Sequence, residues 1–195
     1  MRGFARLSFA PVAGLGAAVL ACACGGASSS SPAPSASATG PVVFDGPGFS
    51  VSIPRGWTDH THDQAAVSSV NANGTMQMLL YAPRTSSVIG NEHINVTTVQ
   101  PTVPDDQLST YLQNVQGTTS NVSQPEPFNL NGATGIFITF NLSATGTSAP
   151  VMLKEQDMLV NHAGETYEIV LNTAESDFNA QQQSLQQVLN SWKWS

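Results

Sequence analysis

Both cysteines of this chain lie near its N-terminus, and this placement decides how the rest of the chain must be held together. Cys22 and Cys24 follow an apolar run from Leu7 to Leu20, and no cysteine occurs after them. The remainder therefore contains no internal disulfide and must fold around an ordinary hydrophobic core. A domain of about 150 residues buries roughly 68–70% of its unfolded surface, which is enough for such a core.

The first 21 residues have the pattern of a secretory signal peptide. Arg2 and Arg6 make the start positive, and the apolar run that follows is shorter than the roughly 20 residues of a membrane-spanning helix. Its length suits the apolar region of a signal peptide, which spans about 7–15 residues. We therefore expect residues 1–21 to direct export.

The end of this segment, Val19-Leu20-Ala21-Cys22, resembles the bacterial lipobox, in which the cysteine is acylated and becomes the new N-terminus. Val19 supplies the branched aliphatic residue three places before Cys22, so we expect Cys22 to carry the lipid. Cys24, which is followed by two glycines, is the alternative lipidation site. The resemblance implies a protein held by lipid at the outer face of the plasma membrane. A plain signal peptide with two uninvolved cysteines is the other interpretation.

Residues 22–40 are expected to form a lipidated N-terminus and a flexible tether. The stretch from Gly25 to Gly40 reads GGASSSSPAPSASATG, with no aromatic, charged or large apolar side chain. Such a segment buries too little apolar surface to offset the entropy of ordering. The globular domain is therefore expected to span residues 41–195.

The charge of this domain excludes two classes of partner. Without the signal peptide, four basic residues face 13 acidic ones, so the formal charge is −9. Nucleic-acid binding needs a basic surface, and anionic lipids attract basic segments. Acyl chains alone would then hold the domain to the membrane, and stable anchoring takes two or more of them.

Alternating apolar residues predict that most of the domain is β-strand. We expect strands at residues 49–53, 94–99, 136–142, 151–160 and 167–171, the last two joined by a turn at 161–164. We also expect a hairpin in which Val67–Asn71 and Met76–Tyr81 are joined by Asn73-Gly74, because Asn-Gly is a strong hairpin signal.

Two segments have helical periodicity instead. Pro104-Asp105-Asp106 offers a helix start, and apolar residues follow at positions 108, 111, 112 and 115, before Gly117. A final helix is expected to begin between Asn172 and Glu175, with a glutamine-rich polar side. Its apolar side would consist of Phe178, Leu185, Val188, Leu189 and Trp192. These elements predict an α+β fold: a mostly antiparallel sheet flanked by two helices.

This order of elements resembles the PsbP-like α/β/α sandwich. The resemblance is carried by GFSVSIPRGW at Gly48–Trp57, by the hairpins and short helix, and by a C-terminal helix ending in Ser-Trp. With the lipobox and the tether, the chain is similar to actinobacterial lipoproteins of the LpqN/LpqT type. The resemblance implies a domain that binds partners rather than one that catalyses a reaction. No functional residue carries over from it.

One cluster has metal-ligand chemistry, Asp59-His60-Thr61-His62-Asp63. His and Asp side chains are zinc ligands, but alternating residues of an extended loop do not converge on one ion. We therefore interpret the cluster as a solvated loop after Trp57. We expect no catalytic, cofactor or metal site, because neither a Gly-x-Ser-x-Gly elbow nor a His-Glu-x-x-His helix occurs.

The remaining candidates have structural interpretations. Trp57 is expected to pack in the core. Of Trp192 and Trp194, one is expected in the core and the other partly exposed, where it would mark a partner surface. The lone histidines His93 and His162 are expected to be structural or solvent-facing.

Three functional hypotheses follow from these observations. The first is a non-enzymatic envelope lipoprotein whose acidic domain binds a protein partner. The second is a carrier or sensor of an apolar small molecule, because adaptable methionine side chains would line a cleft between sheet and helix. These methionines are Met76, Met78, Met152 and Met158, for which ordinary core packing is the alternative. The third is an enzyme, for which residues Asp59–Asp63 would be the first place to look.

Overall fold

The computed structural model describes residues 41–70, 72–83, 91–115, 119–144 and 151–195. Cys22, Cys24 and the expected tether lie outside the described residues. Among the helices of the described part, none is long and apolar enough to cross a membrane.

Two antiparallel sheets form the frame of the domain. The larger sheet has the order β3-β4-β5-β9-β8-β7-β6, and the smaller has the order β1-β2-β10. The strands of the large sheet are β3 (Thr58–Asp59), β4 (Thr75–Tyr81), β5 (His93–Val99), β6 (Glu126–Leu130), β7 (Ala133–Ala144), β8 (Val151–His162) and β9 (Glu165–Ala174). Those of the small sheet are β1 (Val43–Gly46), β2 (Phe49–Ser52) and β10 (Lys193–Trp194). The predicted α+β fold with mostly antiparallel pairing is confirmed.

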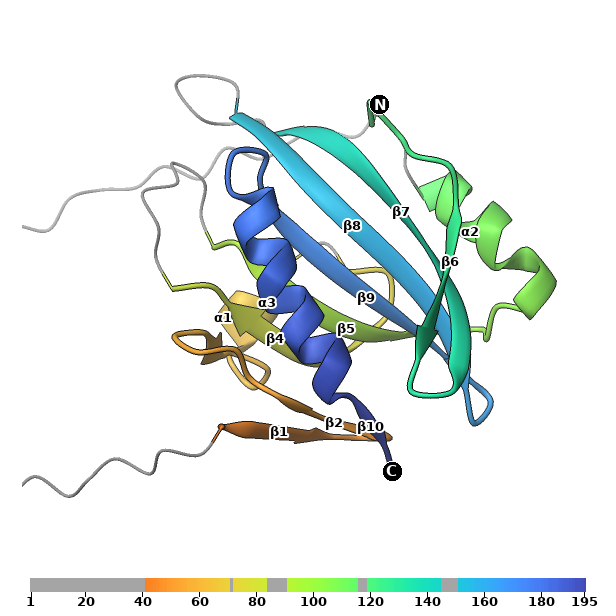
Figure 1. Ribbon diagram of the computed structural model, residues 1–195, viewed down its shortest axis with the longest axis horizontal. Helices are drawn as coiled ribbons and strands as arrows, with labels where there is room; N and C mark the ends of the chain where they lie inside the picture. Colours follow the sequence, from red (N-terminus) through yellow and green to blue (C-terminus); the bar gives the residue numbers. More distant parts are fainter. Residues whose placement is uncertain (1–40, 71, 84–90, 116–118, 145–150) are drawn as a thin grey trace, which may run out of the picture. The chain divides into compact units, whose positions relative to one another are not determined.

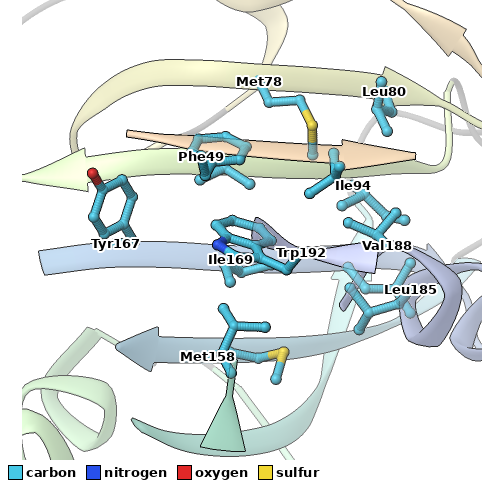
Figure 2. Close-up of a cluster of buried hydrophobic side chains, with 14 of the residues drawn as sticks. Phe49, Met78, Leu80, Ile94, Met158, Tyr167, Ile169, Leu185, Val188 and Trp192 are labelled. Carbon is cyan, nitrogen blue, oxygen red and sulfur yellow. The ribbon is translucent and has the colours of Figure 1, made fainter. Parts of the chain in front are cut away.

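The first face of the large sheet is covered by helix α3 (Phe178–Ser191) and the small sheet. Figure 1 shows α3 crossing this face, with β1, β2 and β10 beside its C-terminal end. Met78, Ile169 and Met158 point from three strands into this layer, and Leu185 and Val188 meet them from α3 (Figure 2). Every one of these side chains is at most 2% exposed, so the layer is a filled apolar core.

The second face of the large sheet carries two separate helices. Helix α1 (Gln64–Ser69) packs Ala66 against Leu79 and Tyr81 of β4. Helix α2 (Leu108–Val115), which follows a 3₁₀ turn at Asp105–Gln107, packs Leu108 and Leu112 over β7 and β8. The predicted helix after Pro104 is therefore confirmed, and Gly117 lies outside the described residues.

The predicted hairpin strand at Val67–Asn71 is wrong, because this segment lies in and after α1. Asp63 Oδ1 accepts hydrogen bonds from the backbone N–H groups of Ala65 and Ala66 and so caps the helix. Strand β4 instead pairs with β3 and β5. The described part of the chain thus has one more α-helix than the two we predicted, and Asn71 lies outside the described residues.

The start of the final helix was also predicted too early. Strand β9 continues to Ala174, where it pairs with Leu153 of β8, and the helix begins at Phe178 after Asp177. The polar side of the helix contains one exception, because Gln181 is only 7% exposed. Its side-chain amide donates to Glu92, which is itself buried.

Candidate functional site

The middle of the second face is polar, although it lies between two helices. Three acidic side chains occupy it: Glu155 and Asp157 on β8, and Glu168 on β9. The antiparallel register places Glu155 opposite Asn172, Asp157 opposite Val170, and Leu159 opposite Glu168. The acids therefore follow one another diagonally across the two central strands.

These acids line a cavity of about 290 Å³ between the sheet, the end of α1 and Thr119. The polar wall also includes His93 and Asn95 of β5 and Asn172 of β9, while Asn73 contributes from the segment after α1. The apolar part of the wall consists of Val70, Ala72, Phe140, Leu142 and Val170. The cavity thus combines a carboxyl-rich floor with an apolar side.

Asp157 differs from the other two acids in its hydrogen bonding. Its side chain is 2% exposed, like that of Glu168, and its Oδ1 atom has no hydrogen-bond partner among the described residues. Burial raises the pKa of this carboxyl well above its usual range, and the charges of Glu168 and Glu155 raise it further. A buried acceptor without a donor costs about 1–3 kcal/mol, so the folded protein retains an unfavourable group here.

Each of the other two acids accepts a hydrogen bond from a neighbouring side chain. Asn172 Nδ2 donates to Glu155 Oε2 at 2.6 Å, and Thr97 Oγ1 donates to Glu168 Oε2 at 3.2 Å. Burial nevertheless raises the pKa of Glu155 to about 7 and also raises the pKa of Glu168. For Glu168, hydrogen bonds from Thr97 and the Asn73 side chain act in the opposite direction.

No basic side chain of the described part pairs with these acids. The ion pair found there joins His60 to Asp63, and Lys154 lies over the ring of Phe178 at 4.4 Å. In the cavity wall, burial lowers the pKa of His93, whose Nδ1 lies 3.1 Å from the backbone oxygen of Asn91. The carboxyls therefore face one another without a compensating cation from the described residues.

The cluster that the sequence singled out, Asp59–Asp63, lies at the start of α1. Asp59 Oδ1 accepts from the Thr61 backbone and hydroxyl, and Asp63 caps the helix. His60 stacks on Tyr81 with ring centroids 4.5 Å apart, and His62 is exposed. Within the described ranges, no three His, Cys, Asp or Glu side chains gather around one point as metal ligands.

One geometric feature of this cluster bears on the enzyme hypothesis. His60 Nε2 lies 3.0 Å from Thr58 Oγ1, and His60 Nδ1 lies 3.4 Å from Asp63 Oδ2. The three residues line a second cavity of about 520 Å³. Hydrogen bonds to Asp63 from the Ala66 backbone and from His60 lower the pKa of its carboxyl. The capping of α1 and the stacking of His60 account for these contacts structurally.

The tryptophans lie where core packing was predicted. Trp57 is 7% exposed and Trp192 is 2% exposed, while Trp194 is half-buried. Trp194 stacks on His162 with centroids 4.1 Å apart, and its Nε1 donates to the backbone oxygen of Leu130. His162 is therefore held at the C-terminal strand, as the structural interpretation predicted.

The four methionines do not line a common cleft. Met78 and Met158 belong to the filled core under α3, and Met76 packs beside α1. Met152 is 38% exposed. Met78 and Met158 thus have ordinary core packing, and the methionine-lined cleft of the carrier hypothesis is wrong; the cavity on the second face is acidic instead.

Glu155, Asp157 and Glu168 were not predicted as site residues. Glu168 lies between two apolar residues of its predicted strand, and Glu155 and Asp157 lie on either side of Gln156, so all three have the pattern of solvated positions. A usable signal was present, because a central strand covered by helices on both faces has no solvated side. An acid in the middle of such a strand is buried, and a buried acid marks a candidate site.

The fold and the cavity define a class of protein: an antiparallel α+β domain with helices on both sheet faces and an acidic cavity on one of them. No protein-family model matches this chain. No curated protein matches it by sequence.

Solved structures do match the fold. One of them is LpqN of Mycobacterium tuberculosis, described as involved in cell envelope biogenesis. Its sequence is 8% identical to this chain, the TM-score is 0.54, and the match covers 76% of this chain and 86% of LpqN. Another is cyanobacterial PsbP of Synechocystis, whose sequence is 14% identical to this chain. The TM-score is 0.42, and the match covers 76% of this chain and 87% of PsbP. The chain therefore shares the fold of LpqN.

Proposed function

We propose that this protein is a lipid-anchored envelope protein whose domain binds a small ligand in the acidic cavity and does not catalyse a reaction. The observation that carries the proposal is Asp157, a buried carboxyl that lines the cavity and whose Oδ1 atom accepts no hydrogen bond from the described residues. An unsatisfied buried polar group is unfavourable for folding alone. A ligand that donates to it would offset that cost.

A binding role agrees with the groups in the cavity wall. Raised carboxyl pKa values also occur in general acids, but a catalytic acid acts together with a positioned nucleophile or base. The histidine in this wall, His93, is bonded to the backbone of Asn91 instead of to a nucleophile. The carboxyl and amide groups here are suited to hold a polar ligand.

The envelope location rests on the N-terminal sequence and on the structural comparison. Cys22 ends a segment that resembles a lipobox, with Cys24 as the alternative. LpqN, which shares the fold, is described as involved in cell envelope biogenesis. A tether at residues 22–40 would let the domain meet ligands at the outer face of the plasma membrane.

A matched pair of cysteine variants tests the anchor. The full chain would be expressed in a bacterium that lipidates exported proteins and labelled with an alkyne-bearing fatty acid. Cys22→Ser should abolish labelling and release the protein from the membrane fraction, whereas Cys24→Ser should leave both unchanged. The reverse result would move the anchor to Cys24, and an unlabelled wild-type protein would contradict the anchor itself.

A second pair of variants tests binding in the cavity. Wild-type protein would be screened by thermal shift against small amines, polyols and amino acids, and each hit confirmed by calorimetry. Val170→Phe fills the cavity and should remove binding, whereas Val43→Phe, at an exposed position on β1, should not. Asp157→Asn provides a second cavity variant of nearly unchanged volume. A screen without hits, or hits that survive both cavity variants, would contradict the proposal.

A protein partner is a second candidate, favoured by the apolar edge at β1. Val42 and Val43 are 65% and 57% exposed, and β1 is an edge strand of the small sheet. Edge strands offer free backbone groups for pairing with another chain. Crosslinking in intact cells should capture a protein that Val43→Lys loses. Capture that is unaffected by Val43→Lys would place the partner elsewhere.

A further inference from the structure

We infer that the ligand of the acidic cavity is an organic cation, a primary ammonium group on a small apolar skeleton. This inference rests on the proposed ligand binding at this site. It is carried by the arrangement of Glu155, Asp157 and Glu168 around a cavity with an apolar side wall.

The first step is the charge of the cavity. The titratable groups that face Asp157 are Glu155 on its own strand, Glu168 on β9, His93 on β5 and Tyr111 on α2. Burial favours the neutral form of His93, so it supplies no positive charge near pH 7, and burial keeps the phenol of Tyr111 neutral. A cationic ligand would supply the charge that the described residues do not.

The second step is the hydrogen-bonding character of the site. Ionised carboxylates only accept hydrogen bonds, and an ammonium group offers three donors. Oδ1 of Asp157 is buried and accepts no hydrogen bond from the described residues, so its acceptor capacity is unused. Glu155 lies two residues along the same strand, and Glu168 lies diagonally across on β9. An ammonium group beside Asp157 would therefore be surrounded by acceptors.

The third step is the size and polarity of the ligand's remainder. The cavity volume of about 290 Å³ is at the lower end for ligand pockets. Phe140, Leu142 and Val170 form an apolar wall beside the acids. This wall would contact the carbon skeleton, and the volume suits a small ligand.

The arrangement of the acidic side chains disfavours a metal ion. Ca²⁺ needs several oxygen ligands at about 2.3–2.6 Å, and within the described part of the chain no three acidic, histidine or cysteine side chains converge as ligands. An organic cation, which is larger than a metal ion and has several donors, fits this arrangement better.

Cation binding in this cavity is expected to release protons. Burial holds the acids partly protonated, with the pKa of Glu155 at about 7. A nearby positive charge lowers carboxyl pKa values, so bound protons leave as the ligand enters. The affinity for a cation should therefore rise as the pH increases from about 6 to about 8, while the amine itself remains protonated.

Calorimetry with two probes of the same carbon skeleton tests the inference. n-Butylammonium and n-butanol would be titrated into the full-length protein in phosphate and in HEPES, at about pH 6 and about pH 8. The cation should bind more tightly at the higher pH, with a buffer-dependent heat that reports proton release. Asp157→Asn should weaken binding by about tenfold or more. Glu126→Gln, at an exposed position on β6, is the matched control and should bind as wild type.

The possible failures are distinguishable. Equal binding of n-butanol and the cation, lost in Val170→Phe, would leave ligand binding at the cavity standing and overturn the cationic ligand. Displacement of the amine by micromolar calcium chloride would replace it with a metal site. Amine binding that persists in Asp157→Asn would move the cation away from this cavity. Thermal unfolding of each variant would show that its fold is retained.

Discussion

Asp157 and Met158 are neighbours on β8, yet their side chains lie on opposite faces of a sheet that is covered on both. Asp157 lines the acidic cavity beside the end of α1, whereas Met158 lies in the apolar core under α3. Both are 2% exposed. The ordinary alternation of a strand therefore buries a carboxyl as completely as a methionine. Burial of the methionine stabilises the fold, whereas burial of the carboxyl carries a desolvation cost.

The first prediction concerns stability as a function of pH. Burial raises the pKa of Glu155 from 4.5 to about 7, so the folded chain holds a proton that the unfolded chain releases. The stability that this protonated carboxyl contributes to the folded state is therefore fully present below pH 4.5 and is lost as the pH rises to about 7. For Glu155 alone, the loss is of the order of 3 kcal/mol. The free energy of unfolding in urea, measured from pH 4.5 to about 7, should show this loss.

The Glu155→Gln variant isolates this effect from other titrations. Glutamine keeps an acceptor for Asn172 but carries no titrating proton. Its unfolding free energy relative to wild type should therefore increase as the pH rises from 4.5 to about 7. Glu126→Gln is the control and should follow wild type at each pH. A constant difference between Glu155→Gln and wild type would contradict the raised pKa.

The sequence predicted the first face well, because one physical signal determines it. Ile169 and Leu171 on β9, and Leu185 and Val188 on α3, recur at strand and helix spacing, and each is at most 1% exposed. Burial of regularly spaced apolar residues is what periodicity detects. The long strands and the two longer helices were therefore predictable, apart from their ends, whereas the short strands β1, β3, β6 and β10 were not predicted.

Helix α1 was not predictable in the same way. Val67 and Val70 have strand propensity, and the following Asn-Gly imitates a hairpin turn. The helix depends on the Asp63 cap and on Ala66 fitting against Tyr81, and the second of these is a tertiary contact. The acidic cavity is bounded by the end of this helix, so an error in α1 concealed the cavity as well.

The second prediction concerns the stack of Trp192 on Phe49. Their ring centroids are 4.3 Å apart, the ring planes differ by 13°, and both side chains are at most 2% exposed (Figure 2). Trp192→Ala should lower the free energy of unfolding by about 3–5 kcal/mol because it leaves a cavity. Urea denaturation followed by circular dichroism measures this loss.

A conservative change at the same position supplies the control. Trp192 Nε1 is buried without a hydrogen-bond partner among the described residues. Trp192→Phe removes this unsatisfied donor and keeps an aromatic ring on Phe49, so it should cost less than about 1.5 kcal/mol. Equal losses for the alanine and phenylalanine variants would show that the stack does not determine stability here.

The third prediction concerns Gln181, the buried residue on the glutamine-rich side of α3. Its Nε2 donates to Glu92 Oε2 at 3.0 Å, and Glu92 Oε1 accepts from the backbone of Ala174. Gln181→Ala removes one hydrogen bond to this buried carboxyl, to which Asp177 is also hydrogen-bonded, and should cost about 1–3 kcal/mol. Gln183→Ala changes an exposed residue of the same helix and should stay within about 0.5 kcal/mol. Similar losses in the two variants would argue against a role for the Glu92 contact.

The last prediction concerns two glycines with the same backbone conformation and different surroundings. Gly48 and Gly132 have φ values of 85° and 93°, a region that costs other L-residues roughly 1–2 kcal/mol. A Cβ atom at Gly48 would meet the hydroxyl of Tyr167, whereas none of the described atoms lies near a Cβ at Gly132. Gly132→Ala therefore measures the backbone cost alone, and Gly48→Ala should be more destabilising by urea unfolding. Because the clash is with the hydroxyl, Tyr167→Phe should recover part of the extra loss in Gly48→Ala; no recovery would place the strain in the β1–β2 turn itself.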